Sequence, residues 1–260
     1  MDQENPEVVK RRRGIYLLPN LFTTGCLFAG FYAIVAAMNG RYEPAAIAIF
    51  VAMVMDSLDG RVARLTNTQS DFGAQYDSLA DMVSFGLAPG LVIYTWALSG
   101  LGKLGWIAAF VYTACAALRL ARFNTQVATG DKRYFQGLPS PAAAAVITGM
   151  MWVGHDYNAD VGYLRIPAFL LTFIIGVLMV STIRYHSFKD LDLRGKVPFV
   201  AILIMVMVYV FISIDPPQVL FFGFLLYAIS GPLLTLKHLR EKRAARKPPE
   251  GTSGDPPPAP

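Results

Sequence analysis

Long apolar stretches recur along this chain of 260 residues, separated by short polar segments. A helix needs about 20 mainly apolar residues to cross the hydrocarbon core of a bilayer. Hydrophobic residues make up 54% of the chain and charged residues only 16%, which disfavours a soluble fold. The pattern predicts an all-α polytopic membrane protein, a bundle of about eight transmembrane helices. The predicted spans are about 15–39, 43–63, 73–98, 104–121, 139–154, 163–183, 197–213 and 218–236.

The basic residues favour one orientation of these spans. If the N-terminus is cytoplasmic, all of the 23 lysines and arginines except Arg41, Lys103 and Arg165 fall in cytoplasmic segments. Cytoplasmic loops of membrane proteins carry such an excess. We therefore expect both termini in the cytoplasm and a location in a bacterial inner membrane. The net charge of +5 is then explained by a basic rim facing anionic lipid headgroups, and no nucleic acid partner is expected.

Composition divides the chain into three parts. Residues 1–14 form a basic cytoplasmic segment, and residues 15–236 form the transmembrane domain, with its motif at 56–81. Residues 237–260 are first basic and then rich in proline. Because the proline-rich part lacks apolar residues to pack, we expect a disordered cytoplasmic tail.

Four aspartates lie at the cytoplasmic ends of the second and third spans. Charged groups are costly at membrane depth, so their presence marks a functional site. Asp56 and Asp59 are three positions apart. Asp77 and Asp81 are four positions apart. On a helix either spacing puts both residues on one face, so two helices can direct four carboxylates at one point.

Carboxylates gathered in this way need cations between them to remain ionised. Oxygen ligands without a nearby His or Cys favour Mg²⁺ or Mn²⁺, which commonly leave coordination positions for substrate phosphates. We therefore expect a site for divalent metal ions and a phosphate-bearing substrate reached from the cytoplasm. A cation-coupled transporter is the non-enzyme alternative, although its acids would be expected nearer the middle of the membrane.

Small residues share the helical face of Asp56. Gly60 and Ala63 leave room for a phosphate or nucleotide to approach the helix, and Arg64 can pair with phosphate oxygens. Gly73, one turn before Asp77, clears the third span in the same way. The alternative is that these residues only let membrane helices pack closely.

The aspartates and small residues together form the pattern DxxDGxxARx8GxxxDxxxD over residues 56–81. This pattern resembles that of the CDP-alcohol phosphatidyltransferase family. The resemblance implies an integral membrane enzyme that transfers a phosphatidyl or similar group from a CDP-linked donor to an alcohol, releasing CMP, with divalent metal ions. It also implies a homodimer, and it implies that Asp81 is the general base as well as a metal ligand.

Three further segments resemble the phosphatidylserine synthase branch of the family: residues 77–89, 119–124 and 135–144. This resemblance implies CDP-diacylglycerol as donor and L-serine as acceptor. Related branches share parts of these segments, so glycerol 3-phosphate, inositol phosphate and choline stay open as acceptors.

Weaker expectations concern contacts outside the motif. Asn20 and Thr23 open the first span and are expected to touch CDP, or else they only start the helix. Arg119, Arg122 and Asn124 end the fourth span at the cytoplasmic level, where a serine carboxylate could bind. Of these we expect Arg122 or Asn124 to contact the acceptor, against the alternative that they anchor the span. Ser84, one turn past Asp81, is expected to contact the acceptor or to pack.

Overall fold

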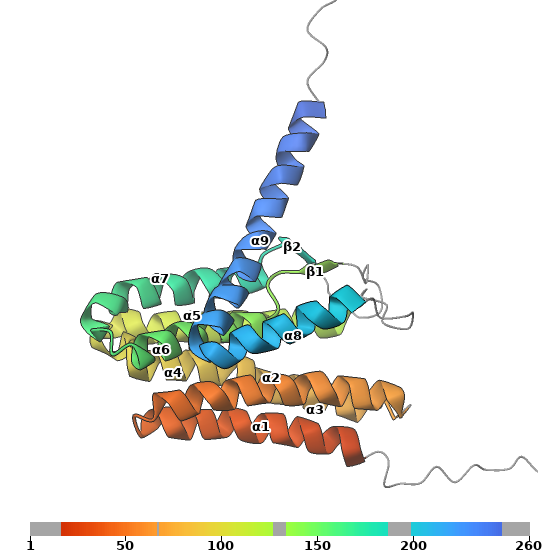
Figure 1. The fold of residues 1–260 in the computed structure, drawn as a ribbon, viewed down its shortest axis with the longest axis horizontal. Coiled ribbons are helices and arrows are strands. Elements are labelled where there is room, and N and C mark those ends of the chain that lie inside the picture. The colour runs from red at the N-terminus through yellow and green to blue at the C-terminus, as the bar shows by residue number, and fades with distance from the viewer. Residues whose placement is uncertain (1–16, 67, 127–133, 187–198, 246–260) are drawn as a thin grey trace, which may run out of the picture.

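Helices form nearly all of the computed structural model, which describes residues 17–66, 68–126, 134–186 and 199–245 (Figure 1). Each predicted span corresponds to one helical rod, and the third rod consists of α3, η2 and α4 joined end to end. In chain order the elements are α1 (Leu17–Met38), α2 (Tyr42–Leu65), α3 (Asp71–Asp81), the π-helical segment η2 (Met82–Leu87), α4 (Ala88–Trp96), the 3-10 helix η3 (Leu98–Leu101), α5 (Lys103–Gln126), β1 (Tyr134–Gln136), α6 (Ser140–Asp156), α7 (Val161–Val180), β2 (Arg184–His186), α8 (Phe199–Ile214) and α9 (Pro216–Ala245).

The predicted helical class and multi-pass character are confirmed. Within the described residues, five segments are long and apolar enough to cross a bilayer: Pro19–Met38, Asp71–Trp96, Lys103–Thr125, Val161–Val180 and Pro216–Lys237. The shorter α6 and α8 have 17 and 16 residues, and α2 carries the charges of the motif. The topology with eight spans therefore stays a prediction.

One antiparallel pair of strands departs from the all-α prediction. Tyr134 of β1 lies opposite His186 of β2, so the segments before α6 and after α7 meet. In Figure 1 this pair lies beside α9. The ring of Tyr185 is fully buried and its hydroxyl donates a hydrogen bond of 3.0 Å to the carbonyl of Ala228 in α9. The pair thereby fixes two connecting segments to the last helix.

The rods form layers, with α1, α2 and α3 at one side and α4 to α7 above them in Figure 1. A short turn at Asn39–Gly40, where Gly40 has a φ of +70°, joins α1 to α2 so that they lie side by side. The last helix crosses α6 and then projects away from the other helices (Figure 1). Gly149 permits this crossing, because a side chain there would meet the Cα of Phe221 at 3.0 Å.

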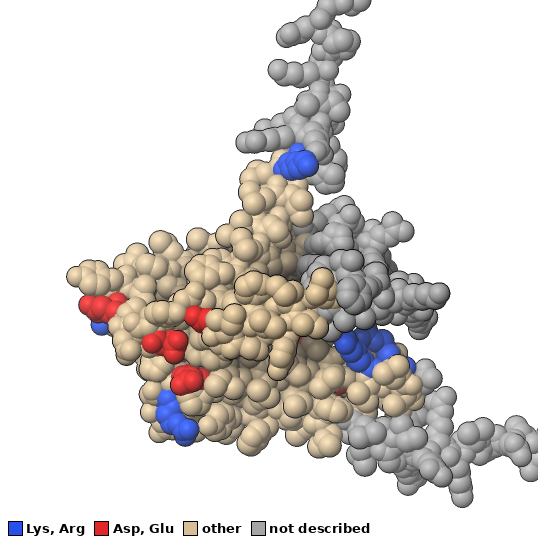
Figure 2. Space-filling view, in the orientation of Figure 1, with Lys and Arg blue, Asp and Glu red and all other residues tan. Residues whose placement is uncertain are grey.

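Charged side chains mark the two ends of the bundle. The end near the α1–α2 turn carries four acidic residues of the described part of the chain, and Figure 2 shows acidic side chains gathered on one side. The opposite end contains the end of α2, the start of α3, the end of α5 and the start of α6 (Figure 1). The acidic residues at the first end are Glu43, Asp156, Asp160 and Asp215.

The described chain ends inside the predicted tail. Helix α9 continues to Ala245, so the predicted boundary at residue 237 falls within a helix. The predicted N-terminal segment, residues 1–14, and the rest of the tail, residues 246–260, lie outside the described residues.

Candidate active site

The two halves of the motif meet at a turn between α2 and α3. Helix α3 begins after Ser70, whose hydroxyl oxygen accepts a hydrogen bond of 3.0 Å from the backbone N–H of Gly73. This N-cap fixes the first turn of α3 and so sets the direction in which the later aspartates point. A side chain at Gly73 would stand 3.1 Å from that hydroxyl oxygen and 3.6 Å from Oδ1 of Asn20.

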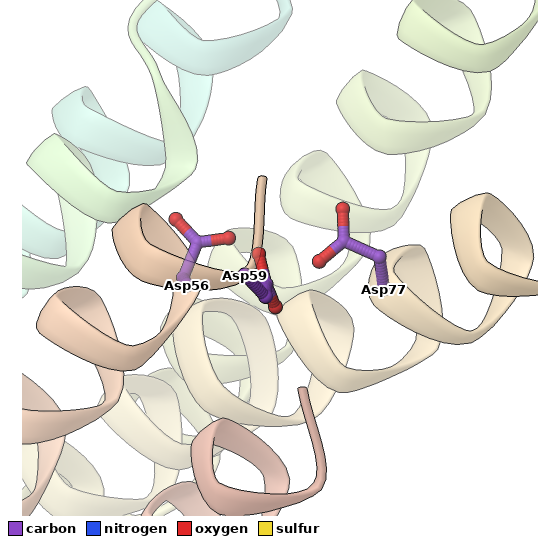
Figure 3. A group of neighbouring side chains, drawn as sticks. All are labelled: Asp56, Asp59 and Asp77. Atoms are coloured by element: carbon purple, nitrogen blue, oxygen red, sulfur yellow. The ribbon is translucent and has the colours of Figure 1, made fainter. Parts of the chain in front are cut away.

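Three of the predicted carboxylates come together. One oxygen each from Asp56, Asp59 and Asp77 lies within 4.8 Å of the other two, with two residues on α2 and one on α3 (Figure 3). Oxygens on opposite sides of a Mg²⁺ ion lie about 4.2 Å apart, since each bond is about 2.1 Å long. The three oxygens therefore suit a hard divalent ion, and the group contains no softer ligand.

Thr23 of α1 holds one of these carboxylates. Its hydroxyl lies 2.9 Å from Oδ2 of Asp59 and 3.1 Å from the carbonyl of Pro19. Both Thr23 and Asp59 are buried. Since a hydroxyl has one proton, the carboxylate is its stronger acceptor. Thr23 thus orients a candidate metal ligand, and its expected contact with CDP stays a prediction.

Asp81 lies beside this group and is not part of it. Its carboxylate interacts electrostatically with those of Asp56 and Asp77. Its Oδ1 is buried without a hydrogen-bond partner. Three carboxylates, and not the predicted four, therefore converge on one point in this conformation. A buried acceptor without a hydrogen-bond partner costs free energy, and a catalytic role or a bound ion is one explanation for such an atom.

The π-helical segment η2 begins directly after Asp81. A π-turn changes the register of a helix and leaves backbone carbonyls to be satisfied from outside. The hydroxyl of Tyr112 in α5 donates a hydrogen bond of 2.8 Å to the carbonyl of Phe85. The hydroxyl oxygen of Thr113 lies 3.3 Å from the carbonyl of Gly86 and 2.9 Å from that of Ala109 in its own helix. Helix α5 therefore stabilises the irregular turn that follows the catalytic candidate Asp81.

The change of register also explains the position of Ser84. Its side chain is fully buried and its hydroxyl donates a hydrogen bond of 2.9 Å to the carbonyl of Cys26 in α1. Gly30 makes room for this contact. This burial favours a packing role for Ser84 over the expected contact with an acceptor.

A cavity of about 420 Å³ opens beside the carboxylates. Its lining includes Gly60, where a side chain would meet nothing within 4 Å, so the glycine keeps this space open. The lining of the cavity combines acidic groups with one arginine and several small residues, as expected of a site that binds a metal-bound phosphate. The cavity is lined by Pro19, Asn20, Thr23, Asp59, Gly60, Ala63, Arg64, Thr68, Gln69, Ser70, Asp71, Gly73, Ala74 and Asp77.

The residues at the end of α5 are placed in different ways. Arg122 donates a hydrogen bond of 2.9 Å to the carbonyl of Val180, at the end of α7. Asn124 is exposed and bonded to Ser78 of α3. Arg119 faces the carboxylates, because its guanidinium interacts electrostatically with Asp81 and Asp56. The sequence led us to expect the acceptor contact at Arg122 and not at Arg119. Both arginines lie at the same membrane level, and only the helical period indicates that they are on different faces of α5.

Comparison with known proteins agrees with this geometry. Residues 16–233 match the model of the CDP-alcohol phosphatidyltransferase family. The chain belongs to this family. The match covers both halves of the acidic motif, the π-helical segment and α5 to α8. As a CDP-alcohol phosphatidyltransferase, the chain is an integral membrane enzyme, and the group of Asp56, Asp59 and Asp77 is its candidate metal site.

Individual relatives are similar over most of the chain. A protein of Helicobacter pylori named CDP-diacylglycerol–serine O-phosphatidyltransferase is 38% identical over 198 residues, which cover 75% of this chain and 83% of the relative. A protein of Mycobacterium tuberculosis with the same name is 37% identical over 181 residues, covering 66% of this chain and 62% of the relative. The archaetidylserine synthase of Methanothermobacter thermautotrophicus is 34% identical over 178 residues, covering 68% and 72%.

Proposed function

We propose that this CDP-alcohol phosphatidyltransferase is a phosphatidylserine synthase. It transfers the phosphatidyl group of CDP-diacylglycerol to the hydroxyl of L-serine and yields phosphatidylserine and CMP. The observation that carries the chemistry is the convergence of Asp56, Asp59 and Asp77 beside a cavity lined by Gly60 and Arg64. Serine as acceptor is supported by the names of the relatives from Helicobacter pylori and Mycobacterium tuberculosis.

The aspartates would hold divalent ions, Mg²⁺ or Mn²⁺ and two in number. We propose Asp56, Asp59 and Asp77 as ligands, joined by Asp81 when substrate is bound. Such ions neutralise the charge of a diphosphate and stabilise the phosphate group that leaves. Their chemistry requires that the carboxylates stay close together, and the hydrogen bond from Thr23 to Asp59 serves this purpose.

The donor would bind in the cavity. Arg64 is exposed at its edge and is proposed to contact the donor phosphates. Gly60, Ala63 and Gly73 would let the nucleotide approach α2 and α3, and Asn20 lies on the same cavity wall. The acyl chains would remain among the exposed apolar side chains that face the membrane.

Asp81 is proposed as the general base. The serine hydroxyl is too weak an acid to ionise unaided, so a positioned base is required. The serine oxygen forms a new bond to the phosphorus on the diacylglycerol side, and the bond from this phosphorus to the CMP oxygen breaks. The proton of the hydroxyl passes to the carboxylate of Asp81, whose Oδ1 has no other hydrogen-bond partner. We propose this direct displacement as the mechanism.

The reaction can be tested by following CMP release. Detergent-purified protein is supplied with CDP-diacylglycerol, Mg²⁺ or Mn²⁺, and in turn serine, glycerol 3-phosphate, inositol phosphate or choline. The proposal requires serine-dependent release that Asp81→Asn lowers by about 100-fold or more. Donor binding by the variant, measured as stabilisation by CDP-diacylglycerol, should persist. Release with another alcohol alone would assign the chain to another branch of the family.

Topology and assembly belong to the same proposal. We propose eight spans, both termini in the cytoplasm, a bacterial inner membrane as location, and a homodimer. The lysines and arginines, of which only Arg41, Lys103 and Arg165 fall outside the predicted cytoplasmic segments, support this orientation. Labelling of single cysteines introduced at Ala159 and at Gln69 by an impermeant thiol reagent in intact cells would test it. Only the cysteine at Ala159 should react, and the mass of the detergent-solubilised protein would test the dimer.

A further inference from the structure

The guanidinium of Arg119 carries an inference that rests on the proposed function and refines it. Arg119 lies on α5 and interacts electrostatically with Asp81 and Asp56. Its Nη1 donates a hydrogen bond of 2.8 Å to Oγ of Ser140, the fully buried first residue of α6. Its Nε–H is buried and has no hydrogen-bond partner. The guanidinium is therefore fixed through Nη1, and its Nε–H is an unused hydrogen-bond donor.

The unused donor defines which edge of the guanidinium is available. Nε and Nη2 form the edge with which an arginine pairs side-on with a carboxylate through two parallel hydrogen bonds. The bond to Ser140 uses Nη1 and leaves this edge unchanged. A buried N–H without an acceptor costs free energy in the empty site, and an incoming anion recovers it.

The position of Arg119 distinguishes it from the arginine of the donor cavity. Among the described residues that line the cavity there is one arginine, Arg64, and Asp59 and Asp77 also line it. Arg119 instead interacts with Asp81 and Asp56. Asp81 and Asp56 thus interact with a cationic side chain other than the Arg64 of the cavity. Since the donor phosphates have the cavity at Arg64, a second anion is expected on the side of Asp81.

We propose that Arg119 binds the carboxylate of the acceptor amino acid, with Ser140 as the residue that fixes the orientation of its guanidinium. The acceptor hydroxyl then lies toward Asp81, because Arg119 and Asp81 interact electrostatically with each other. Arg119 is accordingly a specificity-determining residue, because it recognises the group that L-serine has and a simple amino alcohol lacks.

The test compares acceptors that differ in this group. CMP release by the full-length enzyme is measured with L-serine, with L-serinamide, whose carboxylate is replaced by a neutral amide, and with ethanolamine. In Arg119→Gln the KM for L-serine should rise roughly 10- to 100-fold, as expected for the loss of a charge-assisted bidentate contact. The KM for CDP-diacylglycerol should change less than about twofold, and the preference for L-serine over L-serinamide should shrink by the same factor as the KM rises.

Two further variants make the result specific. Arg119→Lys keeps the charge but loses the planar fork, so its preference should fall between those of wild type and Arg119→Gln. It also decides the question by the same ratio if Arg119→Gln does not fold. Arg41→Gln removes an exposed arginine at the opposite end of the bundle and should behave as wild type.

The possible outcomes separate this inference from the proposed function. Wild-type enzyme that releases no CMP with L-serine would overturn both. Serine-dependent release whose preference for L-serine is the same in wild type and in the Arg119 variants would overturn the assignment of Arg119 alone. Equal losses with L-serine and L-serinamide would also overturn it, since they would mean that Arg119 only supports the fold or the position of Asp81.

Discussion

The hydroxyl of Thr23 donates a hydrogen bond of 2.9 Å to Oδ2 of Asp59 and thereby joins α1 to the acidic group on α2. Thr23→Val keeps the shape of the side chain and removes this bond. Because outer partners of metal ligands typically change metal affinity 10- to 100-fold, the Mn²⁺ concentration for half-maximal CMP release should rise by about tenfold.

Thr23→Ser is the matched control for that change. It retains the hydroxyl and should keep the half-maximal Mn²⁺ concentration of the wild type. An unchanged metal dependence in Thr23→Val would show that Asp59 needs no such partner or that Asp59 is not a ligand.

Metal removal should act through the acidic group. A chelator should abolish CMP release, and Mg²⁺ or Mn²⁺ should restore it, because carboxylate oxygens favour hard ions. Asp77→Asn should raise the required ion concentration by at least about tenfold. Asp160→Asn serves as control, since it lies outside the site and an Asn can still accept the capping bond from Gly162. Restoration of Asp77→Asn at the wild-type concentration would exclude Asp77 as a ligand.

Two glycines should separate stability from activity. A side chain at Gly30 would meet the Cα of Ser84 at 2.7 Å, so Gly30→Ala should force α1 from η2 and destabilise the protein by about 1–3 kcal/mol. A side chain at Gly60 would meet nothing within 4 Å but would enter the donor cavity.

Gly60→Ala should therefore keep the melting temperature in detergent while raising the KM for CDP-diacylglycerol. Melting curves and steady-state kinetics of both variants give the comparison. A melting temperature that falls equally in the two would contradict the distinction.

Part of the site could be predicted from the sequence, because the helices of the motif keep a regular period. The motif positions from Asp56 to Asp77 were predicted to converge because an α-helix has a regular period, and α2 and α3 follow that period. Ser84 was expected on the face of Asp81 by the same rule. The π-helical segment begins between them and changes the register, so Ser84 points at α1. A pattern that assumes a constant period cannot locate such a segment.

Contacts between distant segments were also out of reach. The pairing of β1 with β2 joins residues about fifty positions apart through strands of three residues each, too short to leave an alternating pattern. Arg119 and Ser140 are 21 positions apart and meet through one hydrogen bond between α5 and α6, which no local spacing encodes. The helical class and the membrane setting, by contrast, follow from the length and composition of the apolar stretches.

Tyr112 should contribute to both stability and turnover. Tyr112→Phe removes the donor to the carbonyl of Phe85 and leaves a buried acceptor without a partner, at a cost of about 1–3 kcal/mol. The melting temperature in detergent should fall, and kcat should fall more than the KM for either substrate changes, since the position of Asp81 depends on the adjoining turn. Tyr94→Phe is the control, because Tyr94 is a half-buried tyrosine in α4, outside the π-helical segment. Unchanged stability in Tyr112→Phe would show that the π-turn needs no support from α5.

The π-helical segment η2 after Asp81 divides the third rod into two parts, α3 and α4, which have different roles. Residues of α3 present the acids, whereas α4 buries Val92 and Trp96 in the core. In a regular helix each residue turns the chain by about 100°, so any change that reorients one part would reorient the other. A turn that absorbs register lets natural variation adjust the direction of the acids without repacking the core. One residue inserted or lost at Met82–Leu87 would therefore rotate the acids of α3 relative to the core residues of α4.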